Sequence, residues 1–137
     1  MKVFVDTNIF IDILVDRKPF SYDSTMIYKM CENDIITGYI APITINNIYY
    51  ICRKVKSKSI IKEYLSNIST NFKIAMMTSK TIIKANRLKI HNYEDALQYA
   101  MALEIECNYL ITRNTKDYQD VKTTKVLTPS DFLDKVG

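Results

Sequence analysis

The sequence predicts an α/β fold in which a mainly parallel, five-stranded sheet is covered by helices on both faces. Short β-like segments alternate with longer segments of helical periodicity along the chain. Such alternation is typical of parallel strands joined by right-handed helical crossovers. The composition, with 47% apolar and 25% charged residues, is that of an ordinary globular protein. At this length we expect one domain, residues 1–137, with a single sizeable core.

Five segments are predicted to be strands because they are short and mostly rich in β-branched or aromatic residues. They are Lys2–Val5, Gly38–Ala41, Phe72–Met76, Tyr109–Thr112 and Thr124–Leu127. The segments between them have the apolar periodicity of helices. These are Asn8–Val15, Tyr22–Asn33, Thr44–Val55, Ser59–Ile68, Ser79–Ile90 and Tyr93–Glu106, with a short last helix after Pro129. The helix over 93–106 is apolar on most sides, so we expect it to be largely buried.

Several classes of protein are disfavoured by the composition. The apolar runs are short and the opening residues lack the apolar region of a signal peptide, which favours a cytoplasmic protein with no membrane segment. Cys31, Cys52 and Cys107 lie among apolar neighbours without C-x-x-C spacing, so we expect reduced core residues. There is no glycine-rich phosphate loop, which argues against an NAD enzyme or a nucleotide switch.

Three carboxylates stand where predicted strands end and helices begin. Asp6 follows the first strand, Asp117 follows the fourth, and Asp95 lies in the first turn of the helix over 93–106. Ligands bind beyond the carboxyl ends of parallel strands where the strand order reverses, so these groups converge if the first and fourth strands are neighbours. Like charges held close together resist joint ionisation, and a hard divalent cation relieves that cost. This pattern indicates a metal site for phosphate chemistry.

Each acid taken singly also has a purely structural interpretation. Asp6 can cap the helix that follows it, since Asp is a preferred N-cap residue. Asn92 can be an N-cap with Asp95 at N3, in an approximate capping box. Glu94 and Asp95 both suit the positive end of a helix dipole. Asp117 can be an ordinary loop residue.

Three motifs together resemble the PIN-domain family, and more closely its VapC-type toxins from bacterial and archaeal toxin–antitoxin systems. The motifs are VFVDTNIFID from Val3, YEDALQYAMAL from Tyr93 and LITRNTKDY from Leu110. Their order and spacing match the family over essentially the whole chain. The resemblance implies a three-layer α/β/α domain with a five-stranded parallel sheet and a metal-dependent ribonuclease centre.

The resemblance also implies roles for individual residues. Asp6, Asp95 and Asp117 match the catalytic, metal-binding acids. The polar residues that orient the acids, hold their water shell or assist them are Thr7, Asn8, Glu94, Thr112 and Asn114. The implied cofactor is Mg²⁺ or Mn²⁺, and the implied reaction is hydrolysis of an RNA phosphodiester by metal-activated water.

The chain departs from the family at one position of the site. The family ordinarily has a further acid, usually Glu, early in the helix after the second strand. Here Asn47 occupies that position, with Asn46 as the neighbouring alternative, and no acid lies between Ile35 and Lys62. An amide oxygen can coordinate Mg²⁺, but it is neutral and accepts no proton. Asp12 is a nearby carboxylate whose plainer interpretation is a solvent-exposed helix residue.

This departure leaves more than one hypothesis about function. The first is a metal-dependent endoribonuclease, the toxin of a toxin–antitoxin pair. The second is a PIN-like RNA-binding or regulatory module that has lost turnover through Asn47. The third is a structural partner protein, which the three intact motifs disfavour.

Basic residues are concentrated in the segment without acids. The net charge is +4, and the candidate RNA-binding residues are Arg53, Lys54, Lys56 and Lys58. Such a cluster can contact phosphates without reading sequence. The alternative is a helix C-terminus, whose dipole favours cations, followed by a solvated surface.

The resemblance further implies protein partners, namely a second copy in a homodimer and a small antitoxin. Apolar and aromatic residues in the first half of the chain are candidates for both contacts. They are Phe20, Tyr22, Met26, Ile27, Tyr28, Met30, Ile48, Tyr49, Tyr50 and Ile51. Residues at helical spacing are more often core than interface, so burial in the core is the alternative.

Overall fold

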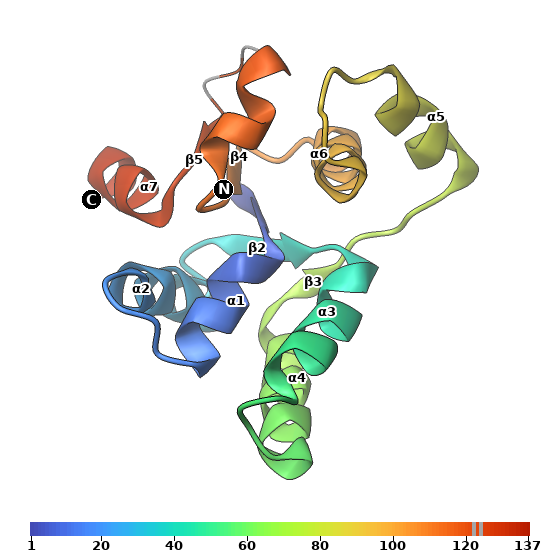
Figure 1. Cartoon of the computed structure of the whole chain (residues 1–137). Coiled ribbons are helices and arrows are strands. Elements are labelled where there is room, and N and C mark those ends of the chain that lie inside the picture. The colour runs from blue at the N-terminus through green and yellow to red at the C-terminus, as the bar shows by residue number, and fades with distance from the viewer. Residues whose placement is uncertain (122, 124) are drawn as a thin grey trace.

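A fully parallel sheet lies at the centre of the molecule, which we describe from a computed structural model covering all residues except Lys122 and Thr124 (Figure 1). The strand order is β3-β2-β1-β4-β5, and each neighbouring pair is parallel. The strands are β1 (Lys2–Val5), β2 (Thr37–Ile40), β3 (Lys73–Ile74), β4 (Tyr109–Ile111) and β5 (Val126–Leu127). The predicted α/β class and five-stranded sheet are confirmed.

The helices connect these strands in the predicted order. They are α1 (Thr7–Leu14), α2 (Phe20–Glu32), α3 (Pro42–Cys52), α4 (Lys58–Asn71), α5 (Ser79–Arg87), α6 (Tyr93–Ile105) and α7 (Pro129–Val136). A 3-10 helix, η1 (Thr115–Val121), follows β4 and was not predicted. Within the described residues, no helix is both long enough and apolar enough to cross a membrane.

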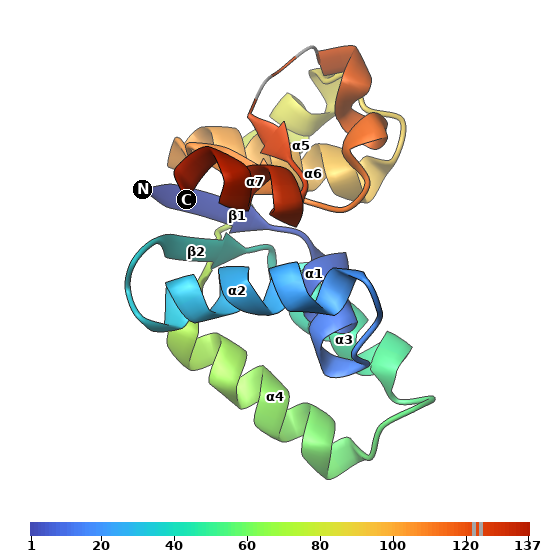
Figure 2. The same ribbon diagram turned by 90° about the vertical axis from the view of Figure 1, so that its left-hand side faces the viewer.

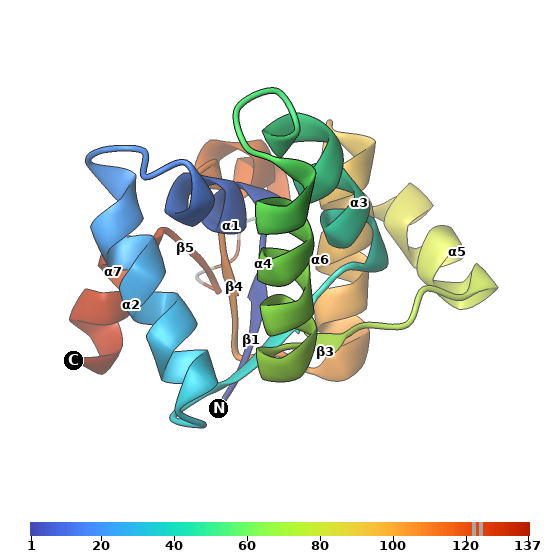
Figure 3. The same ribbon diagram turned by 90° about the horizontal axis from the view of Figure 1, so that it is seen from below.

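Helices cover both faces of the sheet, which gives the three predicted layers. Figures 1 and 2 show α1 to α4 on one side and α5 and α6 on the other. Successive side chains of β1 point to opposite faces of the sheet. Val3 and Val5 belong to the core under α1 to α4, and Phe4 belongs to the core under α6. Figure 3 shows the loop between α3 and α4 at the same end of the molecule as α1.

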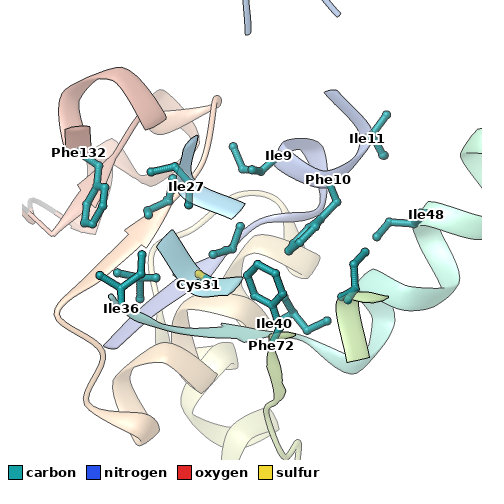
Figure 4. Close-up of a cluster of buried hydrophobic side chains, with 14 of the residues drawn as sticks. Ile9, Phe10, Ile11, Ile27, Cys31, Ile36, Ile40, Ile48, Phe72 and Phe132 are labelled. Carbon is teal, nitrogen blue, oxygen red and sulfur yellow. The ribbon is translucent and has the colours of Figure 1, made fainter. Parts of the chain in front are cut away.

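The core under α1 to α4 consists mostly of isoleucine side chains, with Phe10, Phe72 and Phe132 among them (Figure 4). Phe10 packs edge-to-face on Phe72, with ring centroids 4.9 Å apart. Gly38 of β2 permits this packing, because a Cβ there would lie 2.5 Å from the Phe72 ring and 2.7 Å from Cys31 Sγ. The three cysteines are free and buried, as expected.

Some predicted boundaries are wrong. β3 and β5 have two residues each, shorter than predicted, and Thr124, the predicted start of the last strand, lies outside the described residues. Helix α5 ends at Arg87 instead of Ile90. Helix α6 is largely buried, as expected, but its Leu103 is 41% exposed. Tertiary packing decides where a helix or strand ends, and the periodicity of apolar residues alone does not locate these boundaries.

Candidate functional site

The strand order reverses between β1 and β4, and the predicted site lies there. From β1 the chain builds one half of the sheet through β2 and β3, and β4 and β5 then form the other half. The backbone N–H of Asp6 donates to the carbonyl of Ile111 at 3.0 Å, which joins the two carboxyl ends directly. Asp6 and Thr112 are therefore adjacent, as the sequence predicted for neighbouring first and fourth strands.

An open pocket of about 240 Å³ at this position brings the predicted acids together. Its lining residues are Asp6, Thr7, Asn8, Ile11, Asn47, Ile51, Asn92, Glu94, Asp95, Asn114 and Asp117. No lysine, arginine or histidine of the described chain lines it. A larger cavity of about 440 Å³ lies at the opposite edge of the sheet, near Cys107 and Lys125, and shares no lining residue with the acidic pocket.

Asp6 is held by neutral donors on both carboxylate oxygens. Its side chain is buried, with 6% exposure. Oδ1 accepts from the backbone N–H of Thr7 at 2.7 Å and from Gln98 Nε2 at 3.0 Å. Oδ2 accepts from Thr112 Oγ1 at 2.7 Å and from Asn8 Nδ2 at 3.2 Å. Asp6 therefore caps α1 and also presents a rigid carboxylate, and no lysine or arginine in the described part of the chain pairs with it.

The supporting polar residues form a second layer of hydrogen bonds. Thr112 is fully buried and its Oγ1 accepts from the backbone N–H of Asn114 at 3.1 Å. The hydroxyl of Thr7 lies 2.9 Å from that of Thr44, which ties α1 to α3. The bond from Asn114 orients the Thr112 hydroxyl that donates to Asp6. The bond to Thr44 holds the start of α1, where the backbone N–H of Thr7 donates to Asp6. The structure thus places Thr7, Asn8 and Thr112 against Asp6, with Asn114 bonded to Thr112.

Asp95 lies in the first turn of α6. Its backbone N–H donates to Asn92 Oδ1 at 3.1 Å, so the predicted N-cap is present. Burial raises the pKa of the Asp95 carboxyl to about 7, and the charges of Asp6 and Asp117 add to this rise. The buried Tyr118 hydroxyl lies near this carboxyl but makes no hydrogen bond of normal geometry to it. The predicted repulsion between the acids is therefore present.

Glu94 and Asn47 meet across the pocket from different helices. Asn47 Nδ2 on α3 donates to Glu94 Oε1 at 2.9 Å. Burial and the charge of Asp6 raise the pKa of Glu94, and the Asn47 hydrogen bond partly opposes that rise. Asn46 is exposed and does not line the pocket, so Asn47 is the residue of α3 that reaches it.

Two residues of the site were missed by sequence reasoning. Gln98 is 1% exposed and donates to Asp6, while Thr44 is fully buried and bonds to Thr7. The signal for Gln98 was present, because a lone amide three residues after Asp95 in an apolar helix lies on the same helical face as that acid. Thr44 gave no comparable signal, since its partner is 37 residues away.

The interpretation of Asp12 as a solvent-exposed helix residue is wrong. Asp12 is neither solvent-exposed nor a spare ligand, because it is fully buried and paired with arginine. Arg113 Nε and Nη2 lie 2.6 and 3.2 Å from its two oxygens, and Arg17 Nη1 lies 3.5 Å away. The Arg113 guanidinium also packs over the Phe20 ring, 4.5 Å from its centroid. This pair fixes the segment after β4 against α1.

The candidate RNA-binding residues lie at the end of α3. Arg53 is its C-cap, Lys54 and Lys56 follow in the loop, and Lys58 begins α4. All four are exposed, and the Arg53 guanidinium lies 4.8 Å from the centroid of the Tyr50 ring. The same helix carries Asn47 and Ile51 of the pocket, so the basic loop continues from the acidic site along α3.

The apolar residues proposed for protein contacts divide into buried, half-buried and exposed groups. The half-buried residues are Met26, Tyr28, Met30 and Tyr49, and Phe20 is exposed at 38%. Ile27 and Ile48 are fully buried in the core, so their assignment to an interface is wrong. Tyr22, Tyr50 and Ile51 are exposed and remain available on the surface. Helical spacing shows which residues share a face but not which face another element covers.

The donor set suits a hard divalent cation. Within the described residues, no group of three or more Asp, Glu, His or Cys side chains is already arranged to hold a metal ion. Carboxylates that repel one another stay apart without a cation, and Mg²⁺ commonly keeps several waters and uses only one or two protein carboxylates. Oxygen ligands around an uncompensated acidic pocket therefore fit Mg²⁺ or Mn²⁺, with Asp6, Asp95 and Asp117 as the candidates.

The fold and the pocket together define a class of protein, a parallel α/β/α domain with an acidic centre at the strand reversal. The chain belongs to the PIN-domain family, whose model matches residues 2–116. It is similar to the ribonuclease VapC1 of Aquifex aeolicus (strain VF5). The two sequences are 24% identical over an alignment of 142 positions, which covers 98% of this chain and 94% of the relative.

Two solved structures share this fold. A chain of a toxin–antitoxin complex from Klebsiella pneumoniae superposes with a TM-score of 0.69 and 23% identity, over 93% of this chain and 97% of that one. A chain of VapBC2 from Rickettsia felis, solved bound to a DNA fragment from its promoter, gives a TM-score of 0.67 and 18% identity, over 93% and 97% of the two chains. The predicted resemblance to VapC-type proteins is confirmed.

Proposed function

We propose that this protein is a metal-dependent endoribonuclease and the toxin of a toxin–antitoxin pair. The observation that carries the proposal is the acidic pocket at the carboxyl ends of β1 and β4, where carboxylates gather with no cationic residue among the lining side chains described. A buried cluster of like charges is costly, and a divalent cation beside a phosphate relieves that cost. The ribonuclease VapC1 relative supports the choice of RNA as substrate.

Asp6, Asp95 and Asp117 are the proposed metal ligands and catalytic residues. Thr112 and Gln98 hold Asp6 in one orientation, so its carboxylate loses little freedom when it binds. Mg²⁺ or Mn²⁺ held by these residues would lower the pKa of a bound water and would neutralise charge that develops on the phosphate. No Cys, His or Lys of the described chain lines the pocket, which favours water over a side chain as the nucleophile.

Arg53, Lys54, Lys56 and Lys58 are the proposed contacts to the RNA backbone. They are exposed and lie on the helix end and loop that continue from the pocket. Ammonium and guanidinium groups attract phosphates without reading bases, so this surface would give affinity rather than specificity.

The proposed protein partners are a small antitoxin and a second copy of the chain. The antitoxin proposal rests on the similarity to chains from toxin–antitoxin complexes. Exposed Tyr22, Tyr50 and Ile51 offer apolar contact area for such partners.

A cleavage assay on a mixed RNA pool tests the proposal, with and without added Mn²⁺ and with Asp6→Asn as the inactive control. We expect cleavage that requires the metal and is lost in the variant. Equal cleavage by both proteins, or cleavage that persists in excess chelator, would contradict it.

The second candidate function is an RNA-binding module without turnover, favoured by the neutral Asn47 in the pocket. If the protein binds the same RNA pool but shows no metal-dependent cleavage of it, this second function is selected. An adjacent open reading frame for a small DNA-binding protein would instead favour the toxin.

A further inference from the structure

We infer that Glu94 supplies a fourth carboxylate to the metal centre and that Asn47 is the residue that positions it. The inference rests on the proposed metal-dependent function. It changes the interpretation of Asn47, which becomes the neutral partner of an acid on another helix instead of a weak substitute for a missing acid.

The position of Glu94 is the first support. It lines the same pocket as Asp6, Asp95 and Asp117. Adjacent residues of a helix point about 100° apart, and the neighbours of the two acids differ accordingly. Glu94 accepts a hydrogen bond from Asn47 of α3, whereas no described residue of α3 bonds to the side chain of Asp95, although both acids line the pocket. The first turn of α6 therefore delivers two carboxylates to the pocket from two sides.

The hydrogen bond between Glu94 and Asn47 is the second support. An ionised carboxylate only accepts hydrogen bonds, so the amide must present its N–H to it, and Asn47 Nδ2 does so at 2.9 Å. The bond uses Oε1, and no described residue donates to Oε2. Glu94 is thus held by one oxygen and free at the other, as a ligand oriented by a neighbouring side chain would be.

The neutrality of the side chain at position 47 is the third support. A carboxylate at this position would lie within hydrogen-bond distance of Glu94, and two like charges that close repel strongly. A neutral donor at 47 and an acid at 94 are therefore complementary. The pocket keeps four carboxylates even though α3 contributes none.

Reciprocal substitutions test the inference through Mn²⁺ affinity, measured by calorimetry on the purified full chain. Glu94→Gln should weaken Mn²⁺ binding by at least about 10-fold, which is the usual scale for lost metal-site interactions. Asn47→Glu alone should lower the melting temperature of the metal-free protein, because it places two carboxylates side by side. The double variant Asn47→Glu/Glu94→Gln should recover most of the lost affinity and the melting temperature, since it reverses the acid–amide pair.

The matched control is Glu63→Gln, which makes the same chemical change on the exposed face of α4 and should leave both quantities unchanged. Glu94→Gln that binds Mn²⁺ as tightly as the wild type, while Asp6→Asn does not, overturns this inference and leaves the proposed function standing. A double variant no better than Glu94→Gln overturns the positioning role of Asn47. Wild-type protein that neither binds Mn²⁺ nor cleaves RNA overturns both proposals.

Discussion

Asp6 and Asp12 are two buried carboxylates of the same short segment, and their surroundings differ in one respect. Asp12 is neutralised within the protein by Arg113 and Arg17. Asp6 receives hydrogen bonds only from neutral groups and faces other acids across the pocket. Burial alone therefore does not mark a functional carboxylate. The informative feature is whether the fold already supplies its counter-charge.

The difference also separates two energetic roles. The Asp12–Arg113 pair is complete, so removing either partner leaves the other charge buried. Asp6 lies in an incomplete site, where an external cation adds the interaction that the protein lacks. We expect substitutions at Asp12 to act mainly on stability and substitutions at Asp6 mainly on activity.

The largest expected effect is on the activity of Asp6→Asn. Cleavage should fall by at least about 100-fold, the scale for losing a major electrostatic contribution to a transition state. Stability should change by only about 1 kcal/mol, because relief of repulsion opposes the placement of an amide N–H against donors such as Gln98. RNA cleavage and thermal unfolding measure the two quantities. A large loss of stability with retained cleavage would make Asp6 a structural residue like Asp12.

The next effect is on the stability of Asp12→Asn. Removing the charge that neutralises Arg113 should lower the free energy of unfolding by about 3 kcal/mol. Urea denaturation measures the change. Asp134→Asn, at an exposed position of α7, is the control and should stay within about 0.5 kcal/mol of the wild type. The folded fraction of Asp12→Asn should still cleave RNA, and its inactivity when folded would place Asp12 in the catalytic site.

The pH dependence of the metal-free protein should show the uncompensated charge directly. The pKa of Asp95 is about 7 in the folded protein against an ordinary 3.8, so the folded state binds more protons between these values. Stability should therefore fall as the pH rises from about 4 to about 7. Melting temperatures of wild type and Asp95→Asn in chelator test this. The wild type should lose stability relative to the variant across this range, and parallel curves would contradict the repulsion.

The basic residues, like the two acids, are either paired within the protein or available to a ligand. The smallest expected effect concerns the available basic residues. Arg113 and Arg17 are paired with Asp12, whereas the exposed residues between 53 and 58 are available to phosphates. Replacing all of the latter with Gln should weaken RNA binding similarly across sequences and flatten its salt dependence. The members of this set are Arg53, Lys54, Lys56 and Lys58.

A matched set on the other side of the sheet controls for net charge. It has the same chemical composition and consists of Lys80, Lys84, Arg87 and Lys89. Its replacement by Gln should leave the salt slope closer to that of the wild type. If both quadruple variants show the same salt dependence of RNA binding, the basic residues between 53 and 58 form a solvated surface and not an RNA contact.

The sequence by itself determined the order of elements and the edge of the sheet at which the acids lie. Alternating periodicity was enough to predict a parallel sheet, and the carboxyl ends of parallel strands meet at one edge whatever the details of packing. Asp6 and Thr112 therefore converge across 106 residues of chain without any local signal that links them. Asp95 reached the same pocket because a buried helix holds its first turn in a fixed place.

Only the tertiary structure decided which polar groups are partners. Arg113 reaches Asp12 across 101 residues, Gln98 reaches Asp6 across 92, and Asn47 reaches Glu94 across 47. Helical periodicity states which side chains share a face, but the element that covers that face follows from how the layers pack. For the same reason the sequence could not tell the buried Asp12 from a solvated one, because its burial depends on a counter-charge delivered by the distant loop after β4.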